Sequence, residues 1–237
     1  MADEWYGLAT LSHFWIRRRF EILQRLLQRI PLRGNTIAEI GCGNGLLQAQ
    51  LESVLGIRVD GFDLNIDALK NNQATESSLY YYDIHDRNEA FAAHYNSILL
   101  FDVLEHIPDE DVFLRSVLFH LSTGGVLYVN LPAFQFLYSA YDRAVGHFRR
   151  YNICALRTIA KRNGLVLLDW TYWGLPLVPI VLLRKLLMTG IRDRNAIGRG
   201  FNPRHPALNK IMMAISRCEW SPQQLCGTSL MAALKRA

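Results

Sequence analysis

The sequence predicts an α/β fold with a doubly wound, mostly parallel sheet of seven strands. Three observations predict it. Short apolar runs alternate with segments of helical periodicity, and the first apolar run leads into the glycine-rich stretch AEIGCGNG at residues 38–45. Half of the 237 residues are hydrophobic and a fifth are charged, which is enough to bury a single α/β core.

A helix precedes the sheet. Apolar side chains recur at helical spacing over residues 14–30, and Pro31 and Gly34 end the pattern. We therefore expect residues 1–33 to form an N-terminal helical cap on a single domain.

The core of the domain is expected at residues 34–172. Six apolar runs predict its strands: TIAEI, RVDGFDL, LYYYDI, SILLFDV, GGVLYVNL and GLVLLDW. Helical patterns lie among them: LLQAQLESVL, NIDALKNNQA, DEDVFLRSVLFHL and ICALRTIAKRNG. This repeated order predicts parallel strands with helices on both faces of the sheet. The last strand, SLMAALKR, is expected within residues 227–237. The segment between the core and this strand, residues 173–226, would be unusually long for a loop without structure. We therefore expect a helical insertion over residues 173–226.

Composition excludes several classes of protein. The four cysteines are scattered without a C-x-x-C pair or an accompanying histidine cluster, which predicts reduced thiols and no metal site (Cys42, Cys154, Cys218 and Cys226). The N-terminus lacks the order of a secretory signal, and Arg184 and Lys185 interrupt the apolar part of the insertion, so we expect a cytoplasmic protein without a membrane span. Peripheral contact of the insertion with the inner face of the membrane stays open.

The net charge of +5 comes from local clusters of basic residues and predicts no specific nucleic-acid partner. The sequence does not predict the oligomeric state.

The glycine-rich turn predicts a nucleoside site. Gly41, Gly43 and Gly45 follow the first strand, but Leu46 stands where a dinucleotide fingerprint has its third glycine. Asp63 ends the second strand about twenty residues further on, where a carboxylate accepts both ribose hydroxyls. The ligand is therefore expected to carry an adenosine.

Acidic residues also end other strands of the predicted sheet. Asp83 is placed to accept an adenine amino hydrogen, Ile84 to form an apolar floor for the ring, and Glu39 and Asp102 to face the same crevice. Carboxylates without phosphate-binding lysines suit a cationic cofactor, so the pattern favours a sulfonium over NAD.

These motifs resemble the class I S-adenosylmethionine-dependent methyltransferases, within them the type 11 group. EIGCGNG is similar to the glycine motif of that family, FDLN to its ribose motif, YYDI to its adenine motif and FDVLEHIPDED to the motif after the fourth strand. HFWIRRRFEIL, LYSAYDRAVGHFRRYN and the apolar insertion resemble a bacterial subgroup that often accompanies glycan or lipid genes. Tyr141 departs from that subgroup, where a histidine is expected before Asp142.

The resemblance implies a Rossmann-like methyltransferase fold, S-adenosyl-L-methionine as cofactor and a role for each motif. The glycine motif would approach the methionine, the ribose motif would hold the ribose, Asp83 and Ile84 the adenine, and Phe101 and Asp102 the amino group. Arg19 would pair with the cofactor carboxylate. The implied cofactor-binding residues are Arg19, Glu39, Gly41, Cys42, Gly43, Gly45, Asp63, Leu64, Asp83, Ile84, Phe101 and Asp102.

Methyl transfer needs the nucleophile and the methyl group to be held in line, and a general base is optional. His106 and His147 are the candidate catalytic bases, both expected at the active edge of the sheet. Candidate substrate-binding residues are Trp15, Tyr141, Arg149, Arg150 and Tyr151. The insertion is expected to overhang the crevice, which favours a small-molecule acceptor with a hydrophobic portion, methylated on an oxygen of a glycan, lipid or metabolite.

Two alternatives stay open. An NAD-dependent oxidoreductase would need a Tyr-x-x-x-Lys pair, but Ala144 and Val145 stand where that lysine would be. A non-catalytic S-adenosylmethionine-binding interaction protein would carry the same cofactor motifs. A DNA base N-methyltransferase is disfavoured, because the N-P-P-aromatic motif is missing after the fourth strand and only NLPA follows the fifth.

Overall fold

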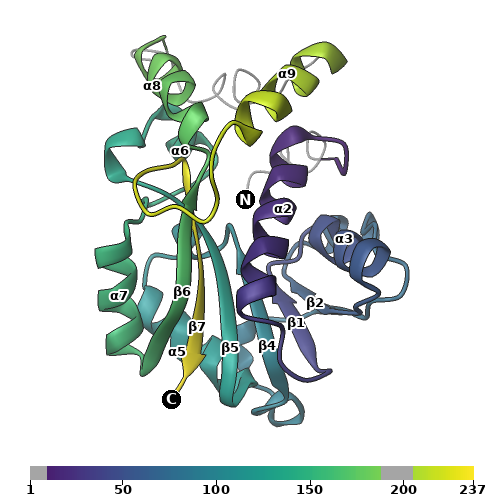
Figure 1. Ribbon diagram of the computed structural model, residues 1–237. Coiled ribbons are helices and arrows are strands. Elements are labelled where there is room, and N and C mark those ends of the chain that lie inside the picture. The colour runs from purple at the N-terminus through teal and green to yellow at the C-terminus, as the bar shows by residue number, and fades with distance from the viewer. Residues whose placement is uncertain (1–9, 188–204) are drawn as a thin grey trace.

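The computed structural model describes residues 10–187 and 205–237, and the parts of the expected cap and insertion at residues 1–9 and 188–204 lie outside them. A single seven-stranded sheet has the order β3-β2-β1-β4-β5-β7-β6 (Figure 1). Its strands are β1 (Ile37–Ile40), β2 (Asp60–Asp63), β3 (Leu79–Tyr81), β4 (Tyr95–Phe101), β5 (Leu121–Pro132), β6 (Leu165–Trp173) and β7 (Ser229–Arg236). The doubly wound α/β fold expected from the sequence is confirmed.

The sheet is mixed rather than fully parallel. Strands β1 to β5 pair in parallel, whereas β7 is antiparallel to both β5 and β6. The chain leaves β6 at the carboxyl edge, passes through the helical insertion at that edge and enters β7 there (Figure 1). Since β7 starts at the edge where β6 ends, the two strands run in opposite directions.

Helices cover both faces of the sheet. They are α2 (Phe14–Arg29), α3 (Leu46–Leu55), α4 (Ile66–Lys70), α5 (Glu110–His120), α6 (Ala140–Ala144), α7 (Ile153–Arg162), α8 (Val178–Leu187) and α9 (Pro206–Arg217). One core cluster packs α5 and α7 against the sheet, and the other packs α2 and α3 against the opposite face. Helix α4 is shorter than its sequence pattern predicts, because the Asn71 side chain bonds to the carbonyl of Asp67 and caps the helix.

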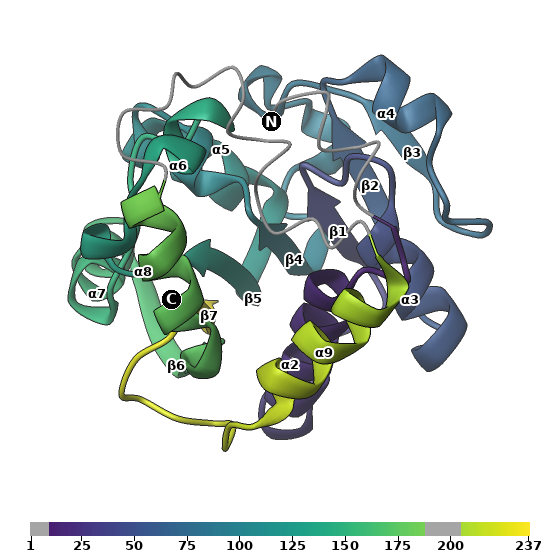
Figure 2. The same cartoon turned by 90° about the horizontal axis from the view of Figure 1, so that it is seen from above.

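The insertion joins the N-terminal helix through a buried ion pair. Arg18 of α2 donates to Glu219, 3.0 Å away, and both side chains are almost fully buried. Glu219 also accepts from the amides of Gly174 and Leu175, just after β6. The α9 residues Met212 and Met213 pack in a small core with α2. Figure 2 shows α9 lying along α2, whereas α8 lies apart from both, over the carboxyl edge near β6. None of the helices in the described ranges is long and apolar enough to cross a membrane.

Candidate active site

The glycine turn after β1 lies against the acid that ends β2. Gly41, Gly43 and Gly45 all have positive φ, between 53° and 75°, a conformation that side chains disfavour. A Cβ on Gly41 would lie 2.4 Å from a methyl group of Val103. The Asp63 carboxylate accepts from the amide of Gly43 at 2.7 Å and from that of Asn65 at 2.8 Å. Asp63 therefore shapes the turn, beside the site where the sequence places the ribose.

Glu39 lies beneath this turn and is almost fully buried. Burial raises the pKa of its carboxyl to about 8; Arg19 opposes the shift, and the nearby Asp63 and Asp102 add to it. A carboxyl in this setting is protonated over much of the neutral range, so it does not act as a fixed negative charge.

A hydrogen-bonded chain connects α2 to the ends of β4 and β5. Arg19 donates to Asp102 at 2.5 Å, and the amide of Asn130 donates to the other carboxylate oxygen at 2.6 Å. The Trp173 indole donates to Asn130 at 2.9 Å, and the ring of Trp15 packs on Trp173 with centroids 4.4 Å apart. Sequence reasoning missed Asn130 because, without its partners, it is one polar residue in an apolar strand.

Asp102 itself has a φ of 57°, uncommon for a residue other than glycine. The preceding Phe101 is buried in the core, with the Arg19 guanidinium 5.6 Å from its ring centroid. Positive φ in non-glycine residues is often found at functional sites. The backbone strain at Asp102 lies where the sequence motifs predict that the amino group of the cofactor binds.

The residues expected around the adenine are spread along the same edge. The Asp83 carboxylate accepts from the amide of His85 at 2.9 Å and caps a short turn. Ile84 is buried in the core, and Leu64 leaves an exposed apolar side chain after β2. Cys42 is buried within the glycine turn, and burial raises the pKa of its thiol.

A cavity of about 130 Å³ opens beside Arg19 and Asp102. Its lining residues come from α2, the turn after β4, the segment around α6, and α8. Of the expected acceptor and catalytic residues, it brings together Trp15, His106, Tyr141, His147 and Arg150. Val181 and Arg184 of α8 also line it, so a described helix of the insertion contributes to the wall as the sequence predicts. The Arg184 guanidinium lies 4.4 Å from the Tyr141 ring centroid, and burial raises the pKa of Tyr141 to about 12.

Two residues predicted to bind substrate lie away from the cavity lining. Arg149 pairs with Glu110 at 3.0 Å and donates to the carbonyl of Pro108. Tyr151 is buried and its hydroxyl donates to Glu110 at 2.5 Å and to Leu104 at 3.1 Å. Each of these two residues joins the β5–α7 connection to the segment from β4 to α5, so their assignment to the substrate stays a prediction.

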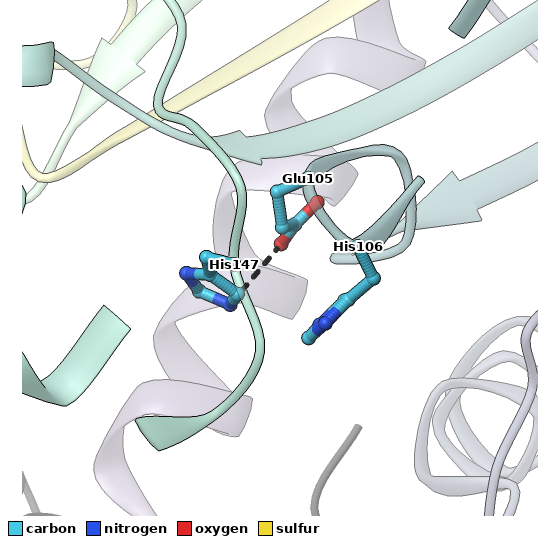
Figure 3. Close-up of side chains that lie close together, drawn as sticks. All are labelled: Glu105, His106 and His147. Carbon is cyan, nitrogen blue, oxygen red and sulfur yellow. Dashed lines mark ion pairs between the residues drawn. The ribbon is translucent and has the colours of Figure 1, made fainter. Parts of the chain in front are cut away.

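Both candidate histidines line the cavity together with Glu105, which the sequence analysis did not select (Figure 3). The imidazole centroids of His106 and His147 are 4.7 Å apart, and His147 Nε2 lies 3.8 Å from Glu105 Oε1. Burial, together with the His147 ring, lowers the pKa of His106 to about 3. Burial raises the pKa of Glu105 well above its usual range.

Asp142 orients His147. It accepts from His147 Nδ1 at 3.1 Å and from Arg150 Nε at 2.7 Å, and Ser139 donates to its second oxygen from both amide and hydroxyl. Burial alone would raise the pKa of Asp142, but these hydrogen bonds and the Arg150 charge hold it below its usual range. Asp142 is thus an anionic hydrogen-bond acceptor for Nδ1 of His147.

Comparison with known proteins decides the class of this site. Residues 13–169 match the family model described as a methyltransferase domain. The chain belongs to this methyltransferase family. This is the family of the class I S-adenosylmethionine-dependent methyltransferases, so the match decides against the NAD-dependent alternative.

Curated relatives match the methyltransferase over part of its length. A ubiquinone biosynthesis O-methyltransferase of Caulobacter vibrioides is 32% identical over 108 residues, 43% of this chain and 42% of that protein. One from Coxiella burnetii is 29% identical over 111 residues, 45% and 47% of the two. A trans-aconitate 2-methyltransferase of Azoarcus sp. is 32% identical over 109 residues, 45% and 43%. The matches span less than half the length of these relatives.

Solved structures share the fold of the methyltransferase. The phosphoethanolamine N-methyltransferase 2 of Haemonchus contortus, in complex with S-adenosyl-L-methionine, has a TM-score of 0.60 at 16% identity, over 95% of this chain and 56% of that one. The magnesium protoporphyrin IX methyltransferase of Synechocystis, with the same cofactor bound, has a TM-score of 0.55 at 12% identity, over 94% and 80%. At these identities the likeness extends to the fold alone.

Proposed function

We propose that this enzyme transfers the methyl group of S-adenosylmethionine to an oxygen of a small glycan-, lipid- or metabolite-type acceptor that has an apolar portion. The observation that carries the proposal is the cavity. Arg19 and Asp102, expected on the cofactor side, line the same cavity as the two histidines expected on the acceptor side. Such a cavity brings a methyl donor and a nucleophile together away from water.

The cavity wall supports an apolar portion in the acceptor. Trp15 and Ile16 of α2, Val145 after α6 and Val181 of α8 line it together with the polar groups. A binding site of this composition buries an apolar body and orients it through a few polar contacts. The O-methyltransferase relatives support oxygen as the atom that is methylated.

In the proposed arrangement the cofactor extends along the carboxyl edge from Asp83 to Arg19. The glycine turn and Glu39 lie against the methionine, Asp63 and Leu64 against the ribose, and Asp83 and Ile84 against the adenine. Arg19 Nε is buried and has no hydrogen-bond partner among the described residues. The guanidinium therefore keeps a donor for the cofactor carboxylate while it holds Asp102.

The chemistry is an in-line displacement in which the positive charge of the sulfonium disperses. The protein's main task is to hold the acceptor oxygen in line with the methyl group, which supplies up to about 7–11 kcal/mol of the barrier. His106 and His147 lie in the cavity where the acceptor oxygen would sit.

Peripheral contact with a membrane is a separate part of the proposal. Leu183, Leu186 and Leu187 of α8 are more than half exposed, beside the basic Lys185. An exposed apolar face next to a cation favours an anionic lipid surface. Sedimentation with anionic vesicles tests this: the chain should pellet, and a Leu186→Gln/Leu187→Gln variant should stay in the supernatant. Equal pelleting of the two would refute it.

The proposed function is tested by measuring transfer of a radiolabelled methyl group from S-adenosylmethionine. The acceptors to be offered are catechols, quinol precursors, carboxylic acids and lipid-linked sugars. For the best acceptor, Val181→Phe should lower kcat/KM at least tenfold without changing cofactor affinity, because the larger ring fills the acceptor side of the cavity. The matched control is Val166→Phe, at an exposed position of β6. Unchanged kinetics for Val181→Phe would remove the cavity from the acceptor site, and labelling of nitrogen or carbon alone would refute O-methylation.

A further inference from the structure

We propose that Glu105, His106 and His147 bind one divalent transition-metal ion, for which Zn²⁺ is the probe. The three residues come from two segments that the fold brings together, the turn after β4 and the loop after α6 (Figure 3). One donor atom from each residue lies within 4.8 Å of the other two. Nitrogen and oxygen ligands lie about 2.0–2.2 Å from a zinc ion, so the ligand atoms of one ion are about 3.3 Å apart, and side-chain movements would have to bring these three atoms closer together.

Both imidazoles are already oriented for coordination. His106 Nδ1 lies 3.2 Å from the carbonyl oxygen of Gly146, which can only accept, so Nδ1 carries the proton and Nε2 keeps its lone pair. His147 Nδ1 faces the Asp142 carboxylate at 3.1 Å, which fixes the same tautomer. A carboxylate or a carbonyl behind the far nitrogen is the usual outer contact of a metal-binding histidine.

The inward-facing atoms lack other partners. His106 Nε2 and both carboxylate oxygens of Glu105 are buried and accept no hydrogen bond from the described residues. His147 Nε2 approaches one of these oxygens, but at 3.8 Å, beyond hydrogen-bond length. Unpartnered buried acceptors are costly and uncommon, and a cation placed among these atoms would satisfy all of them at once.

The donor set indicates the kind of metal. Two imidazole nitrogens and one carboxylate suit zinc and neighbouring transition ions, whereas magnesium and calcium prefer sets made of oxygen alone. Three protein ligands leave at least one coordination position open, as in catalytic rather than structural zinc sites. All three residues line the cavity, so the open position faces the space proposed for the acceptor.

The ion would activate the acceptor, a role that rests on the proposed function, although metal binding itself does not. An acceptor hydroxyl that coordinates the ion loses its proton to water more readily. The resulting oxygen anion forms a bond to the methyl carbon as the carbon–sulfur bond breaks. That electron pair stays on sulfur, so the products are the methyl ether or ester, neutral S-adenosylhomocysteine and one released proton.

Metal binding is tested on the full chain, free of any affinity tag, after treatment with a chelator and dialysis. Calorimetric titration should show one Zn²⁺ per chain, and Co²⁺ should give visible absorption bands from nitrogen and oxygen ligands. His106→Gln, His147→Gln and Glu105→Gln should each weaken binding at least tenfold. Asp142→Asn, which changes only a positioning residue, should weaken it about 10- to 100-fold. His94→Gln, at an exposed histidine that does not line the cavity, is the matched control and should bind as the wild type does.

Three results would overturn the site: no stoichiometric Zn²⁺ in the wild type, unchanged binding in a His106→Gln/His147→Gln variant, or thiolate bands in the Co²⁺ spectrum. The wild-type titration decides even where a variant fails to fold. Cofactor affinity and methyl transfer, measured on the same samples, separate this inference from the function. Full transfer by metal-free protein would refute the activating role alone, whereas Zn²⁺ binding without transfer to any oxygen would refute the proposed function alone.

Discussion

The Asp63 carboxylate is expected to act both in folding and in cofactor binding, and one pair of variants separates the two. Its oxygens accept two amide hydrogen bonds, at 2.7 and 2.8 Å, from the glycine turn and from the start of α4. A hydrogen bond to a partly exposed charged group contributes about 1–1.5 kcal/mol. Asp63→Ala should therefore lower the free energy of unfolding by about 2–3 kcal/mol, and Asp63→Asn, which keeps one acceptor oxygen, by about half as much.

The two Asp63 variants should also bind the cofactor more weakly, and this loss of affinity is separate from the loss of stability. Both variants lose the anionic oxygens proposed to accept the ribose hydroxyls, so we expect S-adenosylmethionine to bind at least tenfold more weakly, about 1.4 kcal/mol. Calorimetry at a temperature where each variant is folded measures the affinity, and urea unfolding measures the stability. Asp67→Ala is the control: this side chain is 82% exposed and pairs only loosely with Lys70. A folded Asp63→Asn protein with wild-type affinity would refute the ribose contact.

Three further predictions concern the structure around the site. Gly41→Ala should lower the free energy of unfolding by about 2–5 kcal/mol and weaken cofactor binding, because the positive φ and the clash with a methyl group both disfavour the new side chain. Gly56→Ala is the control: its φ is also positive but the space around it is open, so it should cost only about 1–2 kcal/mol in urea unfolding. Equal losses would refute the steric argument. Glu219→Gln removes the buried carboxylate partner of Arg18, which keeps only the partly exposed Glu21 at 3.1 Å, and should cost about 1.5–3 kcal/mol. Glu76→Gln, in an exposed pair, should cost less than about 1 kcal/mol, and similar melting curves would contradict this. The pKa of Glu39 is raised to about 8, so the folded state holds its proton where the unfolded state has lost it, and stability should decline as pH rises from about 4.5 to 8. Glu39→Gln should reduce that decline, and an unchanged pH profile would show that this carboxyl is not its source.

The strand-end motifs could be predicted because the geometry of a parallel sheet is local and repetitive. Each acid sits directly after its own apolar run, so its placement at the carboxyl edge follows from the strand alone, as with Asp63 and Asp102. The sequence also indicated a helical insertion, since α8 has a clear apolar pattern. The direction of β7 depends on where the insertion returns to the sheet, which no residue in the strand itself records.

The cavity was only partly predictable because it depends on contacts between distant loops. His147 and Arg149 are neighbours in the sequence, yet the first lines the cavity and the second pairs with Glu110 outside it. Glu105 and His147 meet only because two loops about forty residues apart fold over the same edge. Periodicity places elements in a sheet but does not say which side chains of irregular loops face one another.

A crystal structure of the chain with S-adenosylhomocysteine tests the central claim most directly. We expect the ribose hydroxyls to lie within hydrogen-bond distance of Asp63, and the sulfur to face the cavity lined by Asp102, His106 and His147. The methyl of the corresponding sulfonium would then point at the acceptor space between α2 and α8. A sulfur turned away from this cavity, or a ribose bound elsewhere along the sheet edge, would contradict the account.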